Sequence, residues 1–127
     1  MKINIKKMMF LASISIWASS VFADNYSDTF NKCMDSAEGV TVSIKDCYSS
    51  EIERQDKRLN DNYKNYLANM NSDVKRNFID AQRLWVKFRD KNCEAFASQE
   101  AGGTLSSVIS ESCYLKTTAS RADDFQK

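Results

Sequence analysis

The 127-residue chain contains no histidine and no proline, and it has only three glycines. Without histidine, neither a Ser-His-Asp triad nor a Cys-His nucleophile pair can form, and no imidazole can bind zinc. Without proline, nothing forbids long uninterrupted helices. The composition, 43% hydrophobic and 28% charged, is that of a folded globular protein of about one domain, not of a disordered chain.

Residues 1–23 have the pattern of a secretory signal peptide. Three lysines in the first seven residues precede an uncharged, mostly apolar stretch over 8–22, and residues 21–23 fit the small-x-small cleavage rule. The apolar stretch is shorter than the ~20 residues that span a bilayer, so we expect cleavage before Asp24 and no stable membrane anchor. The mature protein, 24–127, would then be periplasmic or secreted.

Loss of the signal peptide removes three lysines and changes the net charge from +1 to −2. Proteins that bind nucleic acid are usually clearly basic, so this charge argues against a nucleic-acid partner. The carboxylates show no spacing that singles out an acid/base pair. The sequence therefore predicts no enzyme activity, no cofactor and no metal site, and leaves the oligomeric state open.

The chain has four cysteines, Cys33, Cys47, Cys93 and Cys113. In an oxidising compartment an even number of cysteines predicts two disulfides. A four-thiolate zinc site is disfavoured because the close C-x2-C pairs of such sites are absent. We favour Cys33–Cys47 with Cys93–Cys113, since each closes a short loop; Cys47–Cys93 with Cys33–Cys113 is the main alternative.

Apolar periodicity predicts an all-α fold, a single domain of four helices. We expect helices over about 26–38, from Thr41 or Ser43 to about 70, from about 73 to 98, and from Thr104 or Ser106 to the C-terminus, with these hydroxyl residues as N-caps. Gly39 is suited to the left-handed position after the first helix. Helices this short need each other's apolar faces, so they should pack into one compact domain.

The second and third helices should form a long antiparallel hairpin about residues 71–72. This register brings Asp56 close to Arg89 and places Leu59 opposite Trp85 or Leu84. The stripe expected to face inward on the second helix comprises Tyr48, Ile52, Gln55, Leu59, Tyr63, Tyr66 and Met70. The stripe expected on the third comprises Val74, Phe78, Ala81, Trp85, Phe88 and Phe96.

Trp85 and Arg89 lie one helical turn apart, so the guanidinium can lie along the indole face while it also reaches Asp56. We interpret this group as architectural; a recognition surface is the alternative. Asn60 is a poor residue for the middle of a helix, so its amide should bond another element. Arg121 is expected to be a surface or ion-pair residue of the fourth helix.

Residues 99–104, between the third and fourth helices, contain two consecutive glycines. Because glycine lets a backbone approach a partner closely, this linker is a candidate contact loop, although a plain helix end followed by a helix start explains it equally well. The candidate contact residues are Gln99, Gly102, Gly103 and Thr104.

Four motifs in order resemble the LprI-like lysozyme inhibitor domain of bacterial envelopes. They are D-x-x-L-N-x-x-Y, A-Q-R-x-W-x-x-F-R-D-x-x-C, G-G-T and C-x3-T-T-x-x-R-A, and they contain Asp56, Leu59, Asn60, Tyr63, Gln82, Trp85, Arg89, Asp90, Cys93, Gly102, Gly103, Thr104, Cys113 and Arg121. The resemblance implies an exported, helical, disulfide-linked domain that binds and inhibits a lysozyme. The alternative function is a periplasmic structural or adaptor domain that binds another envelope protein.

Overall fold

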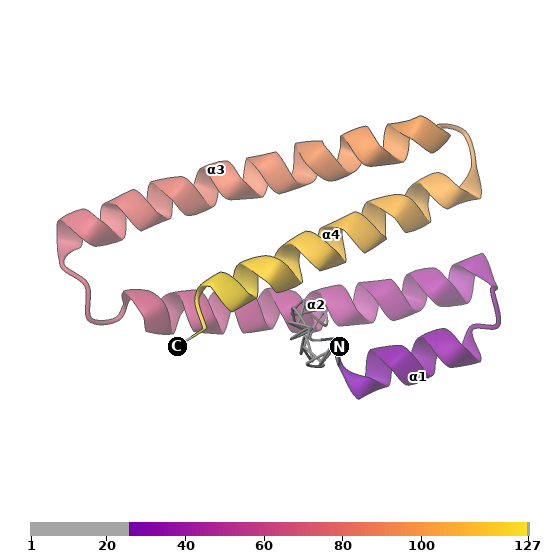
Figure 1. Cartoon of the computed structure of the whole chain (residues 1–127), viewed down its shortest axis with the longest axis horizontal. Coiled ribbons are helices and arrows are strands. Elements are labelled where there is room, and N and C mark those ends of the chain that lie inside the picture. The colour runs from indigo at the N-terminus through magenta and orange to yellow at the C-terminus, as the bar shows by residue number, and fades with distance from the viewer. Residues whose placement is uncertain (1–25, 127) are drawn as a thin grey trace, which may run out of the picture.

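The computed structural model describes residues 26–126, and in this range it shows four α-helices and no strand (Figure 1). The helices are α1 (Asp28–Ser36), α2 (Thr41–Leu67), α3 (Ser72–Ala97) and α4 (Thr104–Asp124), with a short 3-10 helix η1 (Ser98–Glu100) after α3. The predicted all-α, four-helix fold is confirmed. The predicted signal peptide, 1–23, lies outside the described residues. None of the helices described is both long enough and apolar enough to cross a membrane.

Two of the helices start with a side-chain cap. The Ser27 hydroxyl accepts a hydrogen bond from the Phe30 backbone N–H at the start of α1. The Asn71 side chain accepts from the N–H groups of Asp73 and Val74 at the start of α3. Each cap satisfies backbone donors that have no partner within the helix.

The predicted caps of the other two helices were wrong. The N-cap positions of α2 and α4 are Val40 and Gly103, which make no side-chain cap bond, so the predicted hydroxyl residues lie within the first turn of each helix. After α1 the chain takes left-handed conformations at Glu38 (φ 47°) and Gly39 (φ 79°), where a glycine is the least strained residue.

Helix α4 lies between α2 and α3 (Figure 1). The expected hairpin is present, because α3 runs back antiparallel to α2 after the turn at 68–71, but α4 separates the two helices over most of their length. Helix α1 packs against the N-terminal half of α2. The fold is therefore a layered bundle in which α4 is the shared neighbour of both long helices.

The position of α4 explains why one predicted stripe held and the other did not. On α2, every predicted inward residue is buried or half-buried. On α3, Phe78 and Trp85 are half-buried as expected, but Val74, Ala81, Phe88 and Phe96 are exposed, and the buried residues are Arg89, Cys93 and Ala97. Because α3 packs on α4 and not directly on α2, it is rotated relative to the predicted stripe.

The core has two parts. The disulfide-end cluster contains buried Phe30, Ala37, Cys47 and Leu115, from α1, its C-cap, α2 and α4. The aromatic cluster, at the other end of α4, contains buried Leu59, Ala122 and Phe125, against which Tyr63, Tyr66, Phe78 and Trp85 pack.

Both disulfides have the favoured pairing. Cys33–Cys47 joins α1 to α2 across 14 residues of sequence, and Cys93–Cys113 joins α3 to α4 across 20. The described chain has no free cysteine. The alternative pairing through Cys47–Cys93 is excluded in this structure because α4, not α3, lies beside α2.

Candidate functional site

Arg89 joins three helices from a buried position on α3. Its Nη1 lies 3.5 Å from the Asp56 Oδ1 on α2 and donates to the Thr118 Oγ1 on α4 at 3.2 Å, while its Nε donates to the Asp90 Oδ1 at 3.1 Å. The side chain of Arg89 is only 8% exposed. The predicted approach of Asp56 to Arg89 is therefore present, and the hydroxyl of Thr118 is a further acceptor that the sequence did not reveal.

Two aromatic rings hold the Arg89 guanidinium. Its Cζ lies 5.0 Å from the Trp85 ring centroid, as predicted, and 3.7 Å from the centroid of Tyr114. Sequence analysis missed Tyr114, although it directly follows Cys113, which the disulfide brings to α3. A guanidinium among aromatic rings and hydrogen-bond acceptors is well satisfied inside a protein.

Burial raises the pKa values of two acidic groups around Arg89. Burial raises the pKa of the Asp56 carboxyl, Arg89 opposes this rise, and the nearby Asp90 carboxylate adds to it. Burial also raises the pKa of the Tyr114 phenol. The donors of Arg89 are directed to α2, α4 and its own helix, so the arrangement supports the architectural interpretation of Trp85, Arg89 and Asp56, which we retain as a proposal.

Arg121 is a second arginine beside Trp85, in addition to Arg89. Its Nε donates to the Gln82 Oε1 at 2.9 Å and its Nη1 pairs with the Asp124 Oδ2 at 3.0 Å. Its Cζ lies 4.6 Å from the ring centroid of Phe125 and 5.6 Å from that of Trp85. Arg121 thus makes an ion pair as expected, and it also connects α3 to the C-terminal end of α4.

The Leu-Asn-Tyr motif of α2 divides between core and surface. Leu59 is buried, and the ring of Tyr63 packs edge-on against Phe125 at 5.1 Å. Asn60 is exposed, and no hydrogen bond of its side chain is found in the described range, so the prediction that its amide bonds another helix was wrong. The neighbouring Asn62 does so, donating to the Ala122 carbonyl at 2.9 Å.

The candidate contact residues lie together at one end of the molecule. Gln99 belongs to η1, Gly102 has a φ of +88°, Gly103 is the N-cap position of α4 and Thr104 is its first residue; all four are exposed. Gly102 and Gly103, but not Gln99 or Thr104, line an open groove of about 620 Å³ between the end of α3 and the first half of α4. Its wall includes Asp90, Glu94, Ser98, Ser107, Ser110 and Tyr114.

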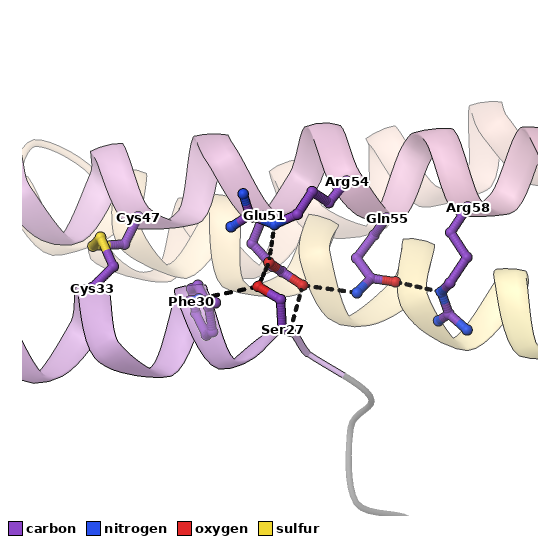
Figure 2. A network of polar contacts seen from close by, with 8 residues as sticks. All are labelled: Ser27, Phe30, Cys33, Cys47, Glu51, Arg54, Gln55 and Arg58. Atoms are coloured by element: carbon purple, nitrogen blue, oxygen red, sulfur yellow. Dashed lines mark hydrogen bonds and ion pairs between the residues drawn. A yellow bond between two sulfur atoms is a disulfide. The ribbon is translucent and has the colours of Figure 1, made fainter.

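A fully buried carboxylate, Glu51 on α2, was missed by sequence reasoning. It is 0% exposed and accepts hydrogen bonds from the Ser27 backbone N–H (3.0 Å), the Ser27 hydroxyl (2.6 Å), Arg54 Nε (2.7 Å) and Gln55 Nε2 (2.8 Å). Figure 2 shows that the chain of contacts continues from Gln55 to Arg58. The spacing of Glu51, four residues from Cys47 and from Gln55, is a signal that could have placed it on the buried side of α2.

Burial of the Glu51 carboxyl acts to raise its pKa, but the hydrogen bonds from Ser27, Gln55 and Arg54 outweigh burial, and the pKa is lowered. Glu111 on α4 is the opposite case. Its Oε2 is buried without a hydrogen-bond partner among the described residues. Burial raises the pKa of Glu111, with Lys45 opposing and Asp46 adding to the rise. The Glu51 carboxylate links α1 to α2, whereas the Glu111 carboxyl remains costly to ionise.

Within residues 26–126, no three histidine, cysteine, aspartate or glutamate side chains are grouped so as to hold a metal ion. The four cysteines are all consumed in disulfides. The groove beside the Gln99–Thr104 linker and the exposed faces of the helices are candidate contact surfaces.

Residues 33–125 match a family model described as "Lysozyme inhibitor LprI". No curated protein and no solved structure matches the chain at a significant level. The match covers both disulfides, the Arg89 cluster and the linker, and its description is that of an inhibitor family, not an enzyme family. The chain therefore belongs to the LprI lysozyme inhibitor family.

Proposed function

We propose that the protein is an exported inhibitor that binds a lysozyme and thereby protects the peptidoglycan of the envelope. The observation that carries the proposal is the family match over 33–125, nearly the whole folded domain. Two disulfides are consistent with a protein that works in an oxidising compartment, outside the cytoplasm.

We further propose that the lysozyme contacts the groove beside the Gln99–Thr104 linker. The charged residues in the groove wall, Asp90 and Glu94, are both acidic, and Glu100 lies in the adjoining η1. C-type lysozymes are strongly basic, so their surface charge is complementary to this wall. The exposed Gly102 and Gly103 leave the backbone of the linker open to a partner.

Glu94 offers a substitution that separates binding from stability. It is exposed, and within residues 26–126 its carboxylate pairs with the exposed Lys91 alone, at 2.6 Å, an interaction worth little to folding. Asp35 on α1 is an equally acidic, exposed residue that does not border the groove, and it provides the matched control.

The test adds the oxidised protein, purified after export, to c-, g- and i-type lysozymes and follows the lysis of labelled peptidoglycan, with complex formation measured by calorimetry. We expect inhibition of at least one type, weakened about tenfold or more by Glu94→Arg and unchanged by Asp35→Arg. If equimolar protein inhibits none of the three and forms no complex, the inhibitor function is wrong for this chain and the alternative of an envelope adaptor domain takes its place. Inhibition that is insensitive to Glu94→Arg and to shortening of the linker would show that the lysozyme does not contact the groove.

A further inference from the structure

Helix α3 carries an exposed apolar stripe on the side away from α4. Leu84 and Phe88, one turn apart, are 67% and 59% exposed. Ala81 and Ala95 are also exposed and continue the stripe, because their spacings of three, four and seven residues keep all four on one side of the helix. We call these four residues the α3 ridge. The residues of α3 that are buried, Arg89, Cys93 and Ala97, lie on a different side.

The α3 ridge differs from the scattered apolar residues found on any protein surface. A leucine and a phenylalanine exposed side by side form a continuous patch, and such patches on small proteins mark contact surfaces. The alanines at its two ends have short side chains, which allow another helix to come close. Sequence periodicity placed part of this ridge in the core, and the structure leaves it uncovered.

The charges beside the α3 ridge are divided between its two halves. Asp73 and Asp80 flank the N-terminal half, and Lys87 and Lys91 flank the C-terminal half. Arg76, Arg83 and Glu94 lie one row farther from the ridge. Asp80 and Lys91 make ion pairs within α3, with Arg83 at 3.5 Å and with Glu94 at 2.6 Å. All four side chains are exposed, so these charges remain accessible to a partner.

We propose that the α3 ridge is a self-association surface, on which α3 of a second copy lies antiparallel. A two-fold axis midway between residues 84 and 88 sets each Phe88 against the Leu84 of the other copy. The same symmetry sets Asp80 of each copy beside Lys91 of the other, whereas a parallel arrangement would oppose Asp80 to Asp80 and Lys91 to Lys91. Lys87 lies beside its own counterpart near the two-fold axis. Asp90, Cys93 and Ala97, which line the groove from α3, lie on another side of the helix from the α3 ridge, and Glu94 lies between the two.

The test is sedimentation velocity of the exported, oxidised chain from about 1 to about 200 µM, the range in which a small interface of this kind associates. We expect a reversible dimer whose dissociation constant rises at least tenfold in Phe88→Asp, with an unchanged melting temperature. Val42→Asp is the matched control, because Val42 is 69% exposed on α2 and lies outside the ridge. It should leave the dissociation constant unchanged.

A charge exchange tests the antiparallel arrangement itself. Asp80→Lys should weaken the dimer, and so should Lys91→Asp, because each creates like charges across the interface. An equimolar mixture of the two variants should associate again as a heterodimer. A chain that is monomeric at every concentration, a dimer insensitive to Phe88→Asp, or a mixture that stays monomeric would each overturn the proposal. Because lysozyme binding is measured separately, this result is independent of the inhibitor function.

Discussion

In the disulfide-end cluster, the nine-residue α1 is tied to α2 by Cys33–Cys47 and by the hydrogen bonds from Ser27 to Glu51. In the aromatic cluster there is no covalent link; instead Phe125 contacts the rings of Tyr63 (5.1 Å), Tyr66 (5.3 Å) and Phe78 (6.4 Å), which come from α2 and α3. A short helix buries too little area to hold its place by packing alone, whereas long helices bring several large rings to one point. The end with the short helix is therefore held by a disulfide and hydrogen bonds, and the end with the long helices is held by the packing of aromatic rings.

Phe125→Ala should have the largest effect, because it removes the ring shared by three others in the aromatic cluster. We expect a loss of about 3–5 kcal/mol in the free energy of unfolding, measured by urea denaturation. Phe96→Ala is the control, since Phe96 is 51% exposed and should cost less than about 1 kcal/mol. Equal losses in the two variants would mean that the aromatic cluster is not the main support of this end.

Replacing Cys33 and Cys47 together by serine should cost about 3 kcal/mol, from the loop entropy of a 14-residue separation. The loss should be local. Hydrogen exchange should show α1 losing its protection while the amides of α3 and α4 keep theirs, and Cys93–Cys113 should still be found in unreduced digests. Unchanged protection in α1 would show that the Glu51 hydrogen bonds alone hold it.

Trp85→Ala tests whether the Arg89 group is architectural. Trp85 is half-buried between two arginines, so we expect a loss of about 2–3 kcal/mol and a lower melting temperature. Lysozyme binding by the fraction that remains folded should be nearly unchanged. A variant of normal melting temperature that no longer binds a partner would instead make Trp85 part of a recognition surface.

Glu51→Gln should cost about 1–3 kcal/mol at neutral pH, because an amide cannot accept from all of the donors that surround the carboxylate. The lowered pKa of Glu51 in the folded state also predicts a pH dependence. A carboxyl with a lowered folded pKa stabilises the fold above its unfolded value, near 4.5, and this stabilisation disappears as the pH falls through the folded pKa. Melting temperatures from pH 7 to pH 3 should therefore fall more steeply for the natural chain than for the variant.

Glu111→Gln should have the smallest effect and the opposite sign, a gain of less than about 1 kcal/mol at neutral pH. The folded pKa of Glu111 is raised, so this carboxyl favours the fold when protonated and loses that contribution as the pH rises from about 4.5 through the folded pKa. A neutral amide avoids the cost of the buried charge. The measurement is urea denaturation at pH 7 and pH 4; destabilisation at pH 7 would indicate that Glu111 has a partner it needs.

The sequence by itself determined the helices and their approximate bounds, and it favoured the disulfide pairing that the structure has. No proline interrupts the long apolar stripe of α2, and the glycines fall where helices end. The short loop between consecutive helices favoured Cys33–Cys47, and only the structure excluded the alternative through Cys47–Cys93. The motifs around Leu59, Trp85 and Cys113 were also sufficient to indicate the LprI family. The register of the predicted hairpin placed Asp56 near Arg89, and helical spacing placed Trp85 one turn from Arg89.

Only the tertiary structure decided which helix covers which face. A stripe of apolar residues shows that they share a side of a helix, but it does not show which neighbour lies against that side. The position of α4 between α2 and α3 buries Arg89 against Tyr114, lets Asn62 instead of Asn60 reach another helix, and leaves Leu84 and Phe88 exposed. Glu51 depends on a different contact, because the packing of α1 on α2 brings its donor Ser27 to it. These contacts depend on long-range packing, which local periodicity does not encode.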